Sequence, residues 1–190
     1  MKISVKNTQG QEQGELEVKF ALIENGKGTQ AVHDTVVAYR AAQRMGTACT
    51  KNVGEVSGSN QSPLWRGGGV VFGPKPRDFA KKVNARTRQL ALRKALSERL
   101  KAGDVVVVDE FKVASPKTKE FLGTLAALEL KGTTLIVAAA DKNLLLASRN
   151  VPHVALTTGE SLNTYDVLRP DKLVFTRSAF EQLEARLMAE

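Results

Sequence analysis

Runs of β-branched and apolar residues alternate with helix-like segments in the second half of the chain. The run VVVV at 105–108 precedes a segment with helical spacing that opens at Ser115-Pro116 and continues to Leu128. The run TTLIVAAA at 133–140 then precedes a leucine-rich helical segment near 142–149. Uninterrupted apolar strands are buried on both faces, and strands that alternate with helices form parallel sheets. The sequence therefore predicts an α/β fold, an open and mostly parallel sheet covered by helices.

Shorter elements are predicted on both sides of this pattern. Residues 1–23 alternate in two runs broken by glycines, which favours a small hairpin or two short strands. Residues 30–45 and 83–101 have helical spacing, and Gly46 is the expected end of the first helix. The expected apolar stripe of the second helix consists of Leu90, Ala91, Ala95, Leu96 and Leu100. The remaining expected elements are strands at 154–156 and 173–175, a short helix around 161–168 and a last helix at 178–188.

Positive charge is concentrated in one third of the chain. The 190 residues carry a formal net charge of +8, and residues 40–101 alone hold 14 Lys+Arg against Glu55, Asp78 and Glu98. A cationic segment on a neutral scaffold is typical of an appendage that binds a polyanion. The alternative, a solvated basic face, is less favoured because the basic residues are interleaved with glycine, proline and aromatic residues without a helical period.

Several classes of protein are excluded by composition. The chain has no apolar stretch long enough to span a membrane and no secretory pattern at its start. Its single cysteine, Cys49, cannot form an internal disulfide, and two histidines with one cysteine are too few for a zinc site. We therefore expect a soluble intracellular protein with no metal and no cofactor.

Three patterns that occur in enzymes are better explained as ordinary structure. Residues 26–31 match GxGxxA, but no strand ending in an acid follows about 20 residues later, as a dinucleotide site requires. The glycines of 67–73 lack the GK[ST] ending of a phosphate loop. Asp109 and Asp141 follow strands, where catalytic carboxylates often lie, yet helix capping accounts for them. We predict no catalytic residue, and a small α/β enzyme that uses Asp109 or Asp141 is the less favoured alternative.

The segment SPLWRGGGVVFGPKPRDF at 62–79 has the composition of an RNA-binding loop. Arg66, Lys75 and Arg77 supply positive charge for phosphates, and glycines allow backbone amides to approach phosphates closely. Three aromatic rings are available, either for stacking on bases or for holding the loop to the domain: Trp65, Phe72 and Phe79.

This segment resembles the loop of the bacterial large-subunit ribosomal protein L-four family. The resemblance continues through GTACTKNVGEVSG at 46–58, RQLALRKALSERL, VVVVDEFKVASPKTKEFL and LNTYDVLRPDKLVFT, and so covers nearly the whole chain. It implies an α/β body formed by 1–45 and 80–190, with a basic loop at 46–79 that penetrates large-subunit (23S) ribosomal RNA toward the peptide exit tunnel. It also implies a structural, non-catalytic role in early subunit assembly, with neighbouring large-subunit ribosomal proteins as partners.

The loop departs from the family in one respect. Members usually carry a long Lys/Arg-rich tip, including a KPWRQKGTGRAR-type run, between the segments that resemble GEVSG and SPLWRGGG. In this chain only Ser59, Asn60 and Gln61 separate these two segments. Contacts that the family makes near the tunnel constriction therefore do not carry over to this chain.

The predicted RNA-binding residues fall into three groups. Trp65 is expected to stack on bases or to wedge between them, and Gly67, Gly68 and Gly69 to bring the backbone close to RNA. The expected phosphate contacts are Arg44, Lys51, Arg66, Lys75, Arg77, Lys81, Lys82, Arg86, Arg88 and Arg93. A regulator that binds messenger RNA through the same loop is the alternative from the residues alone, because it would use the same contacts.

Overall fold

The computed structural model describes residues 2–24, 26–113, 115–130, 132–139 and 141–188. Residue contacts group the chain into two compact units. Met1–Val36 and Asn84–Glu190 form one unit, here called the body unit, and Val37–Val83 form the other, here called the loop unit. Helix α1 (Thr29–Ala42) includes residues of both units.

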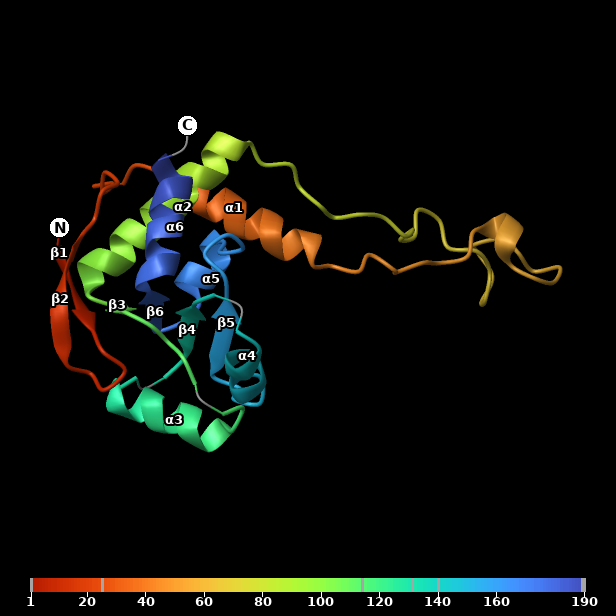
Figure 1. Ribbon diagram of the computed structural model, residues 1–190. Coiled ribbons are helices and arrows are strands. Elements are labelled where there is room, and N and C mark those ends of the chain that lie inside the picture. The colour runs from red at the N-terminus through yellow and green to blue at the C-terminus, as the bar shows by residue number, and fades with distance from the viewer. Residues whose placement is uncertain (1, 25, 114, 131, 140, 189–190) are drawn as a thin grey trace. The chain divides into compact units, whose positions relative to one another are not determined.

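The body unit contains a six-stranded sheet in the order β2-β1-β3-β6-β4-β5 (Figure 1). Strands β1 and β2 form an antiparallel hairpin, and β1, β3, β6, β4 and β5 pair in parallel. The bounds are β1 (Lys2–Lys6), β2 (Glu12–Glu17), β3 (Val105–Val108), β4 (Thr134–Val137), β5 (Val154–Thr157) and β6 (Lys172–Thr176). The predicted α/β class and the predicted hairpin are confirmed. Ala140, the last residue of the predicted strand at 133–140, lies outside the described residues.

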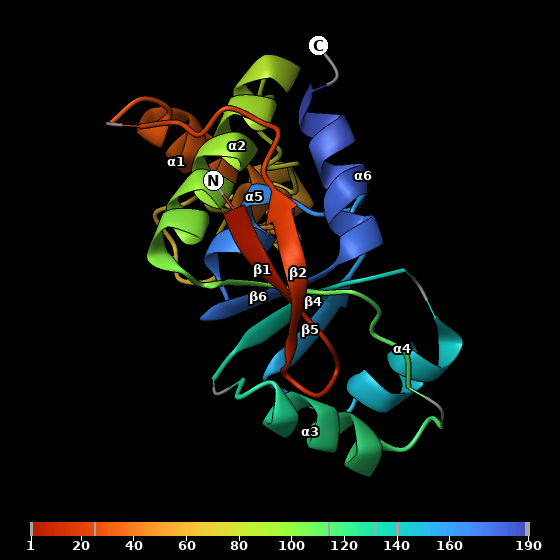
Figure 2. The same ribbon diagram turned by 60° about the vertical axis from the view of Figure 1, so that its left-hand side comes forward.

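Helices cover both faces of the sheet, as Figure 2 shows. One face is covered by α2 (Ala85–Ala102), α5 (Thr164–Leu168) and α6 (Arg177–Met188). The other face is covered by α3 (Thr118–Ala127) and α4 (Lys142–Ser148). The sequence predicts these elements within a few residues of their observed ends.

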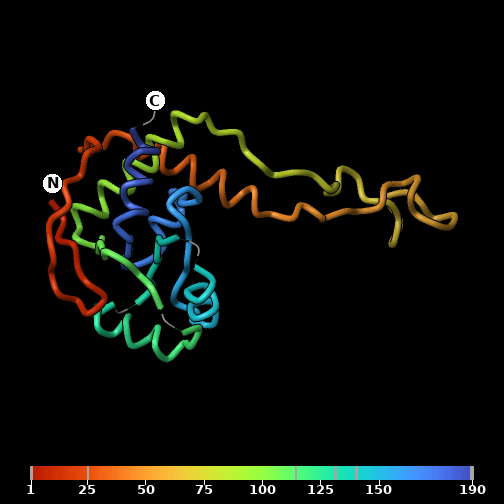
Figure 3. Tube along the Cα trace, in the orientation of Figure 1, coloured from red at the N-terminus to blue at the C-terminus, as the bar shows by residue number. Residues whose placement is uncertain are grey.

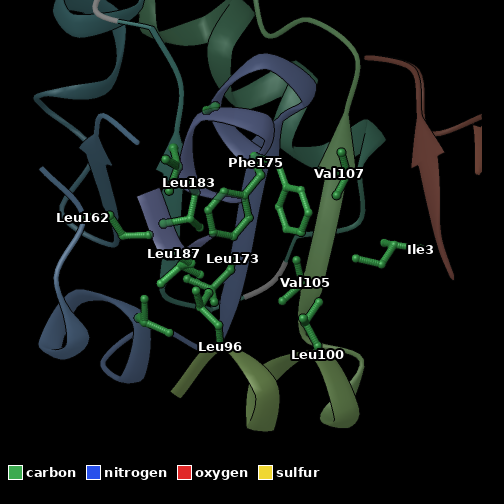
Figure 4. Packing of buried hydrophobic residues seen from close by; sticks show 14 of the residues in the cluster. Ile3, Leu96, Leu100, Val105, Val107, Leu162, Leu173, Phe175, Leu183 and Leu187 are labelled. Atoms are coloured by element: carbon green, nitrogen blue, oxygen red, sulfur yellow. The ribbon is translucent and has the colours of Figure 1, made fainter. Parts of the chain in front are cut away.

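The central strands divide their side chains between two cores. In β6, Leu173 and Phe175 point into the core beneath α2, α5 and α6, whereas Val174 belongs to the core beneath α3 and α4. Figure 4 shows the first core, in which the rings of Phe175 and Phe180 meet edge to face with their centroids 5.6 Å apart. Each fully buried apolar side chain of this kind contributes about 1.5–3 kcal/mol to folding, so the two cores hold the sheet between its helices.

Two helix predictions are corrected by the structure. Leu90, predicted in the apolar stripe of α2, is 41% exposed, and Leu92 is buried in its place. The stripe runs back from Leu100 in steps of four residues through Leu96 to Leu92, and Leu90 lies outside this row. The helix predicted to end at Gly46 ends at Ala42. The structure shows Gly103 as the C-cap residue of α2, in the left-handed conformation that favours glycine at this position.

Candidate nucleic-acid interface

Two segments of the loop unit, 46–51 and 70–77, lie side by side (Figure 3). Three backbone hydrogen bonds join them: Arg77 N–H to Gly46 O at 3.1 Å, Thr50 N–H to Pro74 O at 3.0 Å, and Val70 N–H to Lys51 O at 3.0 Å. Pro74 and Pro76 have no N–H to donate, which prevents a continuous ladder in this region. The segments are therefore held together by separate hydrogen bonds rather than by a sheet.

An ion pair also joins Lys75, in the second segment, to Glu55, which follows the first segment in sequence. Glu55 closes the short 3-10 helix η1 (Val53–Glu55), and its carboxylate accepts the Asn52 N–H at 2.8 Å. The Lys75 ammonium lies 3.0 Å from the Glu55 carboxylate and also donates to the Thr50 carbonyl at 3.0 Å. The Asn52 N–H and Lys75 hold the pKa of the Glu55 carboxyl below its ordinary value. Lys75, a predicted phosphate contact, is therefore already paired inside the loop unit.

Two of the three glycine amides predicted to approach RNA, those of Gly68 and Gly69, form hydrogen bonds within the loop unit. The Gly68 N–H donates to Trp65 O at 3.1 Å, and the Gly69 N–H donates to Gln61 O at 2.9 Å. A side chain at Gly68 would collide with the Ser62 carbonyl oxygen, and one at Gly69 would collide with the backbone of Val53. Of the three glycines, Gly67 alone is exposed, with nothing near its missing side chain.

The three aromatic rings have different surroundings. Trp65 is 61% exposed, and Phe72 is fully exposed at a backbone φ of +53°, a conformation that residues other than glycine rarely adopt. Phe79 is half-buried, and the guanidinium carbons of Arg44 and Arg77 lie over its ring at 4.1 and 4.2 Å from the centroid. Arg44 and Phe79 are distant in sequence, so no local pattern signals this cluster.

The predicted phosphate contacts differ in how accessible they are. Arg93 of α2 is half-buried, and its Nε is buried without a hydrogen-bond partner among the described residues. The other predicted basic side chains are exposed, and within the described part of the chain no carboxylate pairs with them except at Lys75. These accessible cations are Arg44, Lys51, Arg66, Arg77, Lys81 and Lys82 in the loop unit and Arg86 and Arg88 in the body unit.

The alternative enzyme residues do not come together. Asp109 follows β3 and Asp141 is the N-cap residue of α4, which follows β4, but β6 lies between β3 and β4 in the sheet. The expected capping role is not seen: the Asp141 side chain makes no capping hydrogen bond, and the helix after Asp109 has Lys117 at its N-cap. A cavity of about 370 Å³ lies beside Asp109, Glu15 and Arg177, and the described residues that line it include no histidine, serine or cysteine. The glycine motif at 26–31 follows residues 18–24, which form no strand, so it lacks the context of a dinucleotide site.

The described residues also form no metal-ligand cluster and no helix that could cross a membrane. Nowhere in 2–188, apart from the undescribed positions, do three His, Cys, Asp or Glu side chains lie together in a way that could hold a metal ion. None of the helices built from described residues is both long and apolar enough to cross a membrane.

Comparison with known proteins gives consistent matches over nearly the full length. The sequence model of the Ribosomal protein L4/L1 family matches residues 16–186. The large ribosomal subunit protein uL4 of Desulfotalea psychrophila is 40% identical over 203 aligned residues, covering 98% of this chain and 96% of the relative. The proteins of the same name from Thermoanaerobacter sp. and Moorella thermoacetica are 36% and 35% identical, and each alignment covers at least 94% of both chains.

Proposed function

The chain belongs to the ribosomal protein L4/L1 family, and from this premise we propose that it is a structural constituent of the large ribosomal subunit in the cytoplasm. It binds large-subunit (23S) ribosomal RNA there, beside neighbouring large-subunit proteins, and aids early assembly of the subunit around the peptide exit tunnel. The observation that supports RNA binding most directly is the set of exposed and unneutralised cations in residues 44–88.

Phosphate contacts supply most of the affinity in this proposal. Exposed basic side chains without carboxylate partners can release counterions from RNA when they bind, which favours association. Arg66 and Lys51 are two of these cations in the loop unit: both side chains are exposed and neither forms an ion pair with a described residue. Lys75 must leave Glu55, and Arg93 must become more accessible, before either contacts a phosphate.

Base contacts come from the two exposed rings. Trp65 and Phe72 present aromatic surface to solvent, which is unfavourable in water and is relieved by stacking on unpaired bases. The amide of Gly67 is the accessible one of the three glycines, so the closest backbone approach to RNA occurs there. The amides of Gly68 and Gly69 instead keep the loop unit folded.

The same proposal assigns no catalytic role to the chain. Asp109 and Asp141 follow strands that are not neighbours in the sheet, so they do not form a carboxylate pair. Replacing either aspartate with asparagine should leave ribosome incorporation unchanged, and a loss of incorporation without a loss of folding would favour the enzyme alternative.

Sedimentation through a high-salt gradient tests the proposal. A tagged chain expressed in cells should remain with large subunits, and a K51A/R66A variant should be depleted from them at raised salt. The matched control is K119A/K142A, which removes the same charge from exposed positions of the body unit. Migration of the wild-type chain as a free protein would contradict the proposal, and recovery with messenger RNA instead would favour the regulator.

A further inference from the structure

Arg44 and Arg77 both stack on the ring of Phe79 in the loop unit. Their guanidinium carbons lie 4.1 and 4.2 Å from the centroid of the Phe79 ring. The hydrogen bond from Arg77 N–H to Gly46 O, at 3.1 Å, brings the two segments together beside this ring. Gly46 has a φ of +63°, and a side chain there would collide with the Arg77 carbonyl oxygen. The backbone that carries both arginines is therefore closely packed at this point.

Two like charges held over one ring need an explanation. Each guanidinium is attracted to the negative face of the ring, but the two cations repel each other. No carboxylate among the described residues pairs with either arginine, and the nearby Asp78 carboxylate instead accepts the Ala80 N–H at 2.9 Å. Both arginines are exposed, so their remaining donors face solvent. The arrangement is an unneutralised two-cation site.

We propose that Phe79 is a positioning residue that holds Arg44 and Arg77 as a preformed site for the phosphate groups of ribosomal RNA, an inference that rests on the function proposed above. The planar donor fork of a guanidinium matches phosphate oxygens, so two such forks held against one ring can contact two phosphates. Phe79 itself is half-buried and both guanidiniums lie against its ring, so it acts through them rather than by stacking on a base.

The Phe79 ring preorganises the side chains of Arg44 and Arg77 for phosphate binding. A free arginine side chain loses rotamer freedom when it binds a phosphate, and this loss weakens binding. The ring restricts Arg44 and Arg77 before RNA arrives, so less freedom is lost on binding. Phe72, fully exposed and without a guanidinium over its ring in the described chain, provides the matched comparison within the same unit.

The test measures the affinity of the full chain for transcribed 23S ribosomal RNA over a range of salt concentrations. F79L removes the ring but keeps apolar bulk, and it should weaken binding about fivefold to tenfold. F79W restores an aromatic face and should recover most of that loss. R44A/R77A should lower the steepness of the salt dependence by about 1.5, the value expected when two phosphate contacts are lost.

A double-mutant cycle separates positioning from a merely structural role. In the R44A/R77A background, F79L should cause no further loss, whereas F72L should weaken binding equally in both backgrounds. The inference is overturned if F79L binds the RNA with wild-type affinity. It is also overturned if F79L weakens binding equally in both backgrounds, because Phe79 would then act without the arginines. Failure of the wild-type chain to bind the RNA overturns the proposed function and this inference together.

Discussion

The carboxylate of Asp104 joins α2 to the start of β6. It accepts hydrogen bonds from Lys172 at 2.8 Å and from Arg99 at 3.0 Å, and its side chain is 21% exposed. The same Arg99 also donates to the carbonyls of Val167, Leu168 and Pro170 at the end of α5. These contacts join the end of α2, the end of α5 and the start of β6 in one polar cluster.

Replacing this carboxylate should destabilise the body unit in a pH-dependent way. Lys172 and then Arg99 hold the pKa of Asp104 below its ordinary value. The charged form therefore stabilises the fold above a pH of about 4, the unfolded pKa, and this contribution is lost as pH falls through the lower folded pKa. D104N should cost about 1–2 kcal/mol at pH 7 and clearly less in strong acid. Urea unfolding at pH 7 and in strong acid measures the cost of D104N at each pH. An equal cost at both would show that the charge of Asp104 does not stabilise the fold.

Gly69 tests whether the loop unit is ordered before it meets RNA. G69A places a methyl group against the backbone of Val53 and should break the bond from its N–H to Gln61 O. We expect faster hydrogen exchange of that amide and RNA affinity lower by about tenfold, because order lost in the free protein must be restored on binding. G54A is the control, since nothing lies near the missing side chain of Gly54. Equal affinity of the two variants would show that this packing does not matter for RNA.

At the scale of elements, α2 shows what a periodic pattern can and cannot predict. The sequence predicts its existence and most of its buried apolar residues. It misplaces Leu90, because the closely spaced leucines at 90, 92 and 96 fit more than one stripe, and packing against the sheet decides which of them face inward. The arrangement of 46–79 was even less predictable: composition indicates an RNA-binding loop, but the pairing of Lys75 with Glu55 and of Arg44 with Phe79 joins residues distant in sequence.

The free energy of unfolding tests which face of α2 is buried. Leu96 is 1% exposed within the core, whereas Leu90 is 41% exposed. L96A should therefore lower the free energy of unfolding by about 2–5 kcal/mol, because the cavity it leaves cannot close fully. L90A should change it by less than about 0.5 kcal/mol. Chemical denaturation of the two variants compares them, and similar losses would contradict the observed register.

In the whole molecule, the residues that form the hydrophobic cores and most of the accessible cations lie in different parts of the chain. The hydrophobic cores of the body unit are built from residues outside 37–83, and most of the accessible cations lie within 37–83. Binding variants in the loop unit should therefore leave the thermal stability of the body unit unchanged. R66A/R77A tests this division: RNA affinity should fall about tenfold or more, with an unchanged melting temperature. A lowered melting temperature would show that these arginines also stabilise the fold.

The salt dependence of binding by the whole chain measures how many of the accessible cations act together. If about six of them contact phosphates of largely unpaired RNA, the logarithm of affinity should fall with the logarithm of salt concentration at a slope of about −4. Filter binding of transcribed 23S ribosomal RNA between low and physiological salt gives this slope. Each arginine variant that removes one contact should make the slope shallower by about 0.7, whereas K119A/K142A should leave it nearly unchanged. A wild-type slope near zero would contradict the electrostatic basis of the proposed function, because exposed cations that release no counterions are not contacting phosphates.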